Sequence, residues 1–99
     1  MILVFHPDAL EELDDATSYY GQIRPSLSQK FQKHTAAAID RILIRPLACP
    51  SIEFGARRYR LRKFPYGIVY KADDRQVVIY AFMHLMRRPG YWRNRLRPH

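Results

Sequence analysis

Arginines at every second position of one short segment are the residues best placed to do chemistry. Arg58, Arg60 and Arg62 alternate with a tyrosine and a leucine in "RRYRLRK". In a strand, this spacing puts three guanidinium groups on one face, about 7 Å apart. Like charges so close repel one another unless a counter-charge is present. Such a face could follow nucleic-acid phosphates, receive the carboxylates of an acidic peptide, or simply be solvated.

The C-terminal stretch "HLMRRPGYWRNRLRPH" carries a second group of candidate residues. Tyr91 and Trp92 can stack on bases or anchor a protein contact, and Arg93 adds positive charge beside them. The alternative for Trp92 is that its indole folds back over the sheet. His84 opens the stretch and could act as a base or hydrogen-bond a loop.

Most catalytic chemistries lack their residues in this sequence. The histidines, the acidic residues and the single cysteine do not have metal-site spacing, and there is no Gly-rich phosphate loop or nucleophile elbow. We therefore expect no metal and no cofactor. RNA cleavage by a 2′-hydroxyl needs only a base, an acid and cations. The cationic strand face, together with Arg87 and Tyr91, is the one place where such a set could assemble.

Composition limits the size of the fold and the kind of partner. Of the 99 residues 47% are apolar, which is enough for one core and too few for two. We expect a single domain over residues 1–99. A formal net charge of +8 favours an acidic partner. No long apolar span, lipidation motif or signal peptide is evident, so we expect no membrane association and a cytoplasmic location.

The elements that must position these residues follow from the hydrophobic periodicity. We expect a strand at 2–5, helices at about 7–21 and 26–45, and strands at 57–63, 66–72 and 77–84. The expected buried stripe of the first helix is Leu10, Leu13, Thr17 and Tyr20, and that of the second is Leu27, Phe31, Ala38, Ile39 and Ile42. Ser26 with Gln29 resembles a capping box, and Pro46 should end the second helix near Arg45.

The predicted class is therefore α+β, in the order β-α-α-β-β-β. A small antiparallel sheet should pack against an N-terminal helical hairpin. The N-terminal strand should join one edge of this sheet.

Two long stretches resemble the RelE/ParE superfamily of type II toxin–antitoxin toxins. They are "FHPDALEELDDATSYY" and "YRLRKFPYGIVYKADDRQVVIYAFMHLMRRPGYWRNR", and the resemblance covers nearly the whole chain. It implies a compact antiparallel sheet on a helical hairpin. It also implies an acidic cognate antitoxin, encoded by a neighbouring gene, whose C-terminal segment wraps the toxin.

The superfamily has two branches with different targets. The RelE-like branch cleaves mRNA in the ribosomal A site with basic residues and a tyrosine. By that resemblance Arg58, Arg60, Arg87 and Tyr91 would be catalytic here. The third-strand arginine of that branch is replaced by Gly67, and the ending "H-x-x-R-x-P-x-Y-W" looks more like the ParE-like branch, which poisons DNA gyrase.

We therefore expect a toxin that inhibits growth by poisoning DNA gyrase, without catalysis of its own. The alternative is a ribosome-dependent mRNA endonuclease. A third possibility is a toxin fold that has lost toxicity, or a basic domain that acts mainly as a co-repressor with its antitoxin. The residues expected to bind a partner are Arg58, Arg60, Arg62, His84, Arg87, Tyr91, Trp92 and Arg93.

Overall fold

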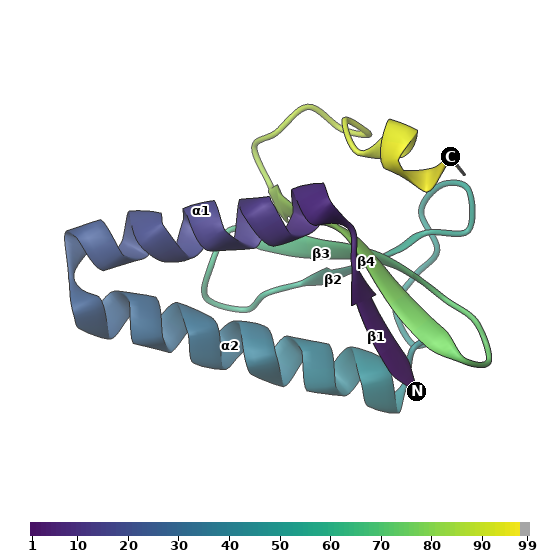
Figure 1. The fold of residues 1–99 in the computed structure, drawn as a ribbon, viewed down its shortest axis with the longest axis horizontal. Coiled ribbons are helices and arrows are strands. Elements are labelled where there is room, and N and C mark those ends of the chain that lie inside the picture. Colours follow the sequence, from purple (N-terminus) through teal and green to yellow (C-terminus); the bar gives the residue numbers. More distant parts are fainter. Residues whose placement is uncertain (98–99) are drawn as a thin grey trace.

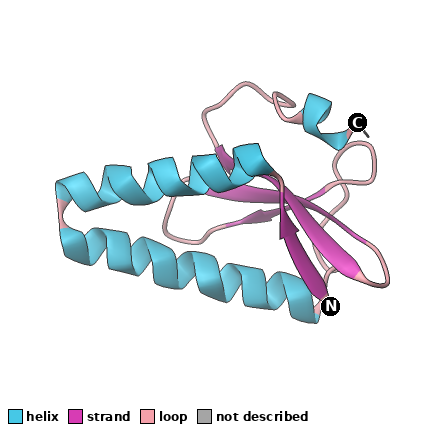
Figure 2. Ribbon diagram, in the orientation of Figure 1, coloured by secondary structure: helices cyan, strands magenta, loops and turns pink. Residues whose placement is uncertain are grey.

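Two long helices lie against one face of a four-stranded sheet (Figure 1). The computed structural model describes residues 1–97. One strand, two successive helices and three further strands follow one another, as Figure 2 shows, and this order confirms the predicted α+β class. The elements are β1 (Ile2–Phe5), α1 (Pro7–Ile23), α2 (Pro25–Ile44), β2 (Arg57–Arg60), β3 (Tyr66–Ala72), β4 (Gln76–His84) and the 3₁₀ helix η1 (Arg93–Leu96).

The sheet has the strand order β1-β4-β3-β2. The last three strands form the predicted antiparallel meander, with β3 pairing both β4 and β2. β1 joins the outer side of β4 as predicted, but runs parallel to it. The sheet is therefore mixed rather than purely antiparallel. A parallel pair needs a long connection between its strands, and here the helical hairpin and the other two strands supply it.

The two helices meet across a single residue. α1 continues through Gly21, the predicted stop, to Ile23, because a lone glycine is tolerated in a helix. The extended backbone of Arg24 then turns the chain, and Pro25 occupies the first turn of α2, where no N–H is required. The capping box predicted at Ser26 is therefore wrong, since Ser26 already lies inside α2.

The main core lies between the hairpin and the sheet. On α1 the buried residues are Ala9, Ala16 and Tyr20, whereas the predicted Leu10 is 46% exposed. The two alanines let the helix approach the sheet closely. The stripe predicted for α2 is confirmed, with Phe31, Ala38 and Ile42 buried and Leu27 and Ile39 packed at the margin.

Four aromatic rings fill the part of this core near the hairpin turn. The ring of Tyr20 lies 5.0 Å from the rings of Phe31 and Phe64 and 6.4 Å from that of Tyr66. Most of the pairs are edge-to-face, the arrangement that aromatic quadrupoles favour. This cluster ties both helices to the chain around β3.

The opposite face of the sheet is covered by loops and by the C-terminal segment. A second cluster there consists of Ala56, Val69, Ala81, Met83 and Trp92. Trp92 is only 3% exposed, so its indole folds back over the sheet. In Figure 1 the yellow C-terminal segment lies above the strands, near the upper right of the view.

The loop between α2 and β2 is held to the sheet by polar contacts. The hydroxyl of Tyr70, a fully buried side chain in β3, donates to the carbonyl of Pro46 at 2.7 Å. Arg57 donates to the carbonyls of Leu47 and Cys49 at 3.3 and 2.5 Å. These contacts fix the start of β2, on which Arg58 and Arg60 lie.

We predict that Tyr70→Phe lowers the free energy of unfolding by about 1 kcal/mol, because the Pro46 carbonyl loses its donor. Urea denaturation with circular dichroism measures this change. The control is Tyr80→Phe, since the Tyr80 hydroxyl makes no hydrogen bond with residues 1–97. Equal effects of the two substitutions would contradict the anchoring role of Tyr70.

Candidate functional site

The predicted row of three arginines is divided in the structure. β2 ends at Arg60, and the chain then bends as Leu61 enters the core. Arg58 and Arg60 stand opposite Val69 and Gly67, on the sheet face away from the helices. Arg62 lies beyond the strand and lines a hollow beside α2. The expectation of three guanidinium groups on one strand face is therefore wrong, and two remain.

Gly67 provides the space that Arg58 occupies. A Cβ atom at position 67 would lie 3.0 Å from Cδ and 3.1 Å from Cγ of Arg58. The stem of Arg58 therefore runs across the glycine. A side chain at position 67 could not be accommodated without moving Arg58. The absence of an arginine at this position on β3 therefore allows Arg58 to lie where it does.

Arg58 and Arg87 line one hollow of about 160 Å³. Arg58 comes from β2 and Arg87 from the segment after β4, and Trp92 and Met83 close its base. Glu53 also lines this hollow. Two of the predicted basic residues, Arg58 and Arg87, thus lie at one hollow, which the buried side chains of Met83 and Trp92 also line.

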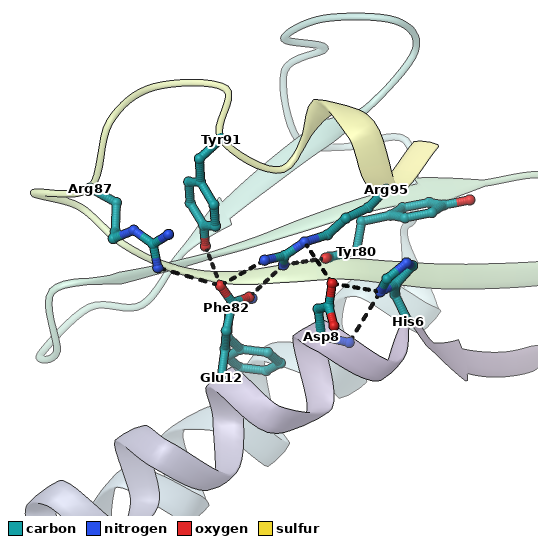
Figure 3. A network of polar contacts seen from close by, with 8 residues as sticks. All are labelled: His6, Asp8, Glu12, Tyr80, Phe82, Arg87, Tyr91 and Arg95. Atoms are coloured by element: carbon teal, nitrogen blue, oxygen red, sulfur yellow. Dashed lines mark hydrogen bonds and ion pairs between the residues drawn. The ribbon is translucent and has the colours of Figure 1, made fainter. Parts of the chain in front are cut away.

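The carboxylate of Glu12 links the C-terminal segment to α1 and β4 (Figure 3). Glu12 of α1 accepts hydrogen bonds from the Tyr91 hydroxyl at 2.7 Å and from the Phe82 N–H at 3.2 Å. It also accepts two from the Arg95 guanidinium, at 2.7 and 3.1 Å, and lies 3.8 Å from Arg87 Nη1. The Glu12 side chain is only 16% exposed, which strengthens each of these contacts.

This network completes the edge of β4 where β1 ends. β1 pairs with β4 only as far as Phe5, opposite Ile79. Beyond that point the Tyr80 carbonyl accepts from Arg95 at 2.9 Å and the Phe82 N–H donates to Glu12. The side chains of Arg95 and Glu12 therefore make hydrogen bonds with the backbone of the β4 edge that a neighbouring strand would otherwise make.

The charges of the network suit its partial burial. Burial alone would lower the pKa of Arg95, but the hydrogen bonds and negative charge of Glu12 outweigh it and raise that pKa. The guanidinium carbon of Arg87 lies 3.8 Å from the centre of the Tyr91 ring, a cation–π contact. Both arginines are thus held by groups within the chain.

Tyr91 is poorly placed for proton transfer. Burial, followed by its hydrogen bond to Glu12, raises the pKa of the phenol above its ordinary value. Its hydroxyl lies at the outer edge of β4, whereas Arg58 and Arg60 lie on β2, with β3 between the two strands. The ring of Tyr91 therefore lies against Arg87, while its hydroxyl is directed to Glu12.

The remaining predicted residues have partners of their own. Nδ1 of His84 accepts from the N–H of Met86 at 3.1 Å, and the ring packs edge-on against Tyr66. Arg93 donates twice to Glu53, at 2.5 and 2.8 Å, and this hydrogen bonding holds the pKa of Glu53 below its usual value. Trp92, expected as a partner contact, is instead a core residue.

Glu12 and Arg95 were not predicted as site residues. Glu12 lies at helical spacing between the buried Ala9 and Ala16, which is the available signal that it faces inward. Arg95 is 83 residues away in sequence, and nothing local to either residue indicates their pairing.

Two further findings concern classes of function. Within residues 1–97, no group of three or more His, Cys, Asp or Glu side chains is arranged to hold a metal ion. None of the helices in that range has the length and apolar character needed to cross a bilayer.

Comparison with known proteins extends over nearly the whole chain. Residues 3–98 match the family described as "ParE toxin of type II toxin-antitoxin system, parDE". Among solved structures, the fold is similar to a chain from a structure described as "Chromosomal ParDE TA system from P. aeruginosa", with a TM-score of 0.73 and 17% identity. The similarity covers 86% of this chain and 96% of that one. A search of curated proteins found no match.

We predict that Glu12→Gln lowers the free energy of unfolding by about 2 kcal/mol, because an amide donor would face the donors of Arg95 and the charge would be lost. Hydrogen–deuterium exchange of residues 91–96 should also become faster. Glu11→Gln, on the exposed side of the same helix, is the matched control. Similar exchange in the two variants would show that Glu12 does not anchor this segment.

The raised pKa of Tyr91 predicts a loss of stability in alkali. Above pH 10.0, the ordinary value, an unfolded chain releases the phenol proton while the folded chain keeps it, so the free energy of unfolding falls as pH rises. Tyr91→Phe should make this decline shallower between about pH 9 and about pH 11. Denaturant titrations across that range measure the slope. An unchanged slope would contradict the placement of the phenol against Glu12.

Proposed function

The chain belongs to the ParE toxin family of type II toxin–antitoxin systems, and we propose that it inhibits growth by poisoning DNA gyrase. Membership implies that the chain is a toxin with an antitoxin partner. The observation that carries the proposal is the family match over residues 3–98, since poisoning of gyrase is the activity expected of the ParE-like branch.

The arrangement of the basic residues supports binding rather than catalysis. An endonuclease of the RelE type would need the arginines and the tyrosine around one phosphate. Here the Tyr91 hydroxyl is engaged by Glu12, and Gly67 stands where that branch has an arginine.

We place the target-binding surface around Arg58, Arg60 and Arg87. Ion pairs within residues 1–97 involve neither Arg58 nor Arg60. Exposed apolar side chains stand in the adjoining loops, with Phe54 70% and Met86 86% exposed. A basic surface with exposed apolar side chains suits binding to a target protein that is itself bound to DNA. The positive charge would steer the approach, and the apolar contacts would add affinity.

The remaining parts of the proposal concern the domain, its location and its antitoxin partner. We propose that residues 1–99 form one toxin domain that acts in the cytoplasm, where gyrase works. We further propose that the antitoxin is acidic and encoded by a neighbouring gene. The formal net charge of +8 supports an acidic partner.

A supercoiling assay with purified gyrase tests the target. We expect excess toxin to stop supercoiling and to leave DNA cleaved by gyrase. The double substitution Arg58→Ala with Arg60→Ala should raise the half-inhibitory concentration about tenfold or more, because two charged contacts are lost. The matched control is the double substitution Arg24→Ala with Arg75→Ala. Arg24 is exposed between α1 and α2, and Arg75 is exposed between β3 and β4.

Unchanged supercoiling at excess toxin would reject the gyrase proposal. Primer extension on translated mRNA, with the same toxin preparation, tests the endonuclease alternative. Cuts within codons would indicate ribosome-dependent cleavage. Growth unaffected by induced toxin would indicate a fold that has lost toxicity.

A further inference from the structure

The glycine near the start of β3 is not required by the backbone there. Gly67 is buried and lies inside β3, which has a paired strand on each side. A glycine at such a place weakens a strand, because it has no side chain to pack and much conformational freedom to lose. Within residues 1–97 a positive φ is found at Gly55 and Gly90 but not at Gly67. A side chain is therefore absent at position 67 for reasons of space.

The stem of Arg58 takes up this space. Its Cδ and Cγ atoms would lie 3.0 and 3.1 Å from a Cβ atom at position 67, and Cδ2 of Leu85 would lie 3.7 Å away. Arg58 belongs to β2, yet it lines the hollow that Met83 of β4 and Arg87 also line. Because β3 separates β2 from β4, Arg58 reaches that hollow by crossing β3 over the glycine.

This crossing restrains one of the two arginines of β2 and leaves the other free. Arg58 is half-buried, whereas Arg60 is exposed. Neither forms an ion pair within residues 1–97. A stem that is already packed has lost part of its rotamer freedom, so ordering it against a target costs less entropy. Arg58 is thus a cation held in place before any target arrives.

A side chain at position 67 would remove this restraint. The methyl group of an alanine would already press on the stem of Arg58, and a β-branched side chain would fill the crossing. Arg58 would then have to project away from β3, at a distance from the hollow that Arg87 lines. The residue type at position 67 therefore decides where the Arg58 charge lies, although Gly67 itself is covered.

We propose that Gly67 is a positioning residue of the target-binding surface, which acts by holding Arg58 at the hollow that it shares with Arg87. The inference rests on the proposed function for its target. The position of Arg58 can be determined without gyrase, so the inference and the gyrase proposal can fail separately.

A double-mutant cycle in the supercoiling assay tests whether Gly67 acts through Arg58. We expect Gly67→Val to raise the half-inhibitory concentration about fivefold, because Arg58 must then be ordered during binding. In toxin that already carries Arg58→Ala, the same substitution should change inhibition by less than about twofold, since no stem remains to displace. Equal effects of Gly67→Val in the two backgrounds would overturn the proposal.

The smaller substitution Gly67→Ala separates positioning from stability. Alanine is intrinsically better than glycine inside a strand, so the melting temperature should not fall, yet inhibition should weaken. Gly21→Ala is the matched control, because its Cβ atom would lie at an ordinary 3.7 Å from the Ser28 side chain. It should leave inhibition within about twofold of the unmodified toxin. Inhibition by Gly67→Ala toxin that equals that of the control would overturn the proposal.

Crystal structures of the unmodified toxin and the Gly67→Val variant give a readout that does not involve gyrase. We expect Arg58 to leave the hollow in the variant while the pairing of β2 with β3 is retained. An Arg58 side chain that stays at the hollow would overturn the proposal whatever the supercoiling assay shows. If the unmodified toxin does not inhibit gyrase, the gyrase proposal fails, and growth inhibition by induced toxin then serves as the readout of the same cycle.

Discussion

The position of the C-terminal segment depends on the carboxylate of Glu12. That carboxylate receives hydrogen bonds from β4, from Tyr91 and from Arg95, and so joins α1, the sheet and the chain end at one point. Trp92 follows Tyr91 directly and covers the second face of the sheet. Because a partly buried anion without partners is costly, the cations that surround Glu12 and the anion itself hold one another in place.

Some basic residues have an acidic partner within the fold and others have none. Arg87, Arg93 and Arg95 pair with Glu12 or Glu53, so the charge of the tail is largely used within the fold. The arginines on and after β2, together with the lysine and arginine of α2 beside them, have no such partners within residues 1–97. Several basic side chains without ion pairs are thus gathered beside one sheet edge, where they would attract acidic groups.

Periodicity was sufficient to predict the order of the elements, because each helix and strand carries its own apolar spacing, whereas Gly21 and Ser26 misplaced the turn between the helices. They failed where a choice depended on distant partners. Leu10 and Ala9 are both acceptable inward residues, and only packing against the sheet selects the alanine. The parallel pairing of β1 with β4 joins residues about seventy positions apart. For the site, Arg58 and Arg87 were named in one set with Arg60 and Tyr91, and the structure places these two arginines on one hollow. The contact of Glu12 with Arg95 and the burial of Trp92 exist only once the C-terminal segment has packed against the sheet.

The shortness of β2 and its charges have a consequence for the toxin by itself. An uncovered strand edge is a template on which identical chains can stack edge to edge and aggregate. Here the edge offers only four residues, and positive side chains flank it on both faces. Two copies approaching through this edge would bring cations against cations. The positive charges beside this edge therefore oppose pairing between two copies of the toxin through β2.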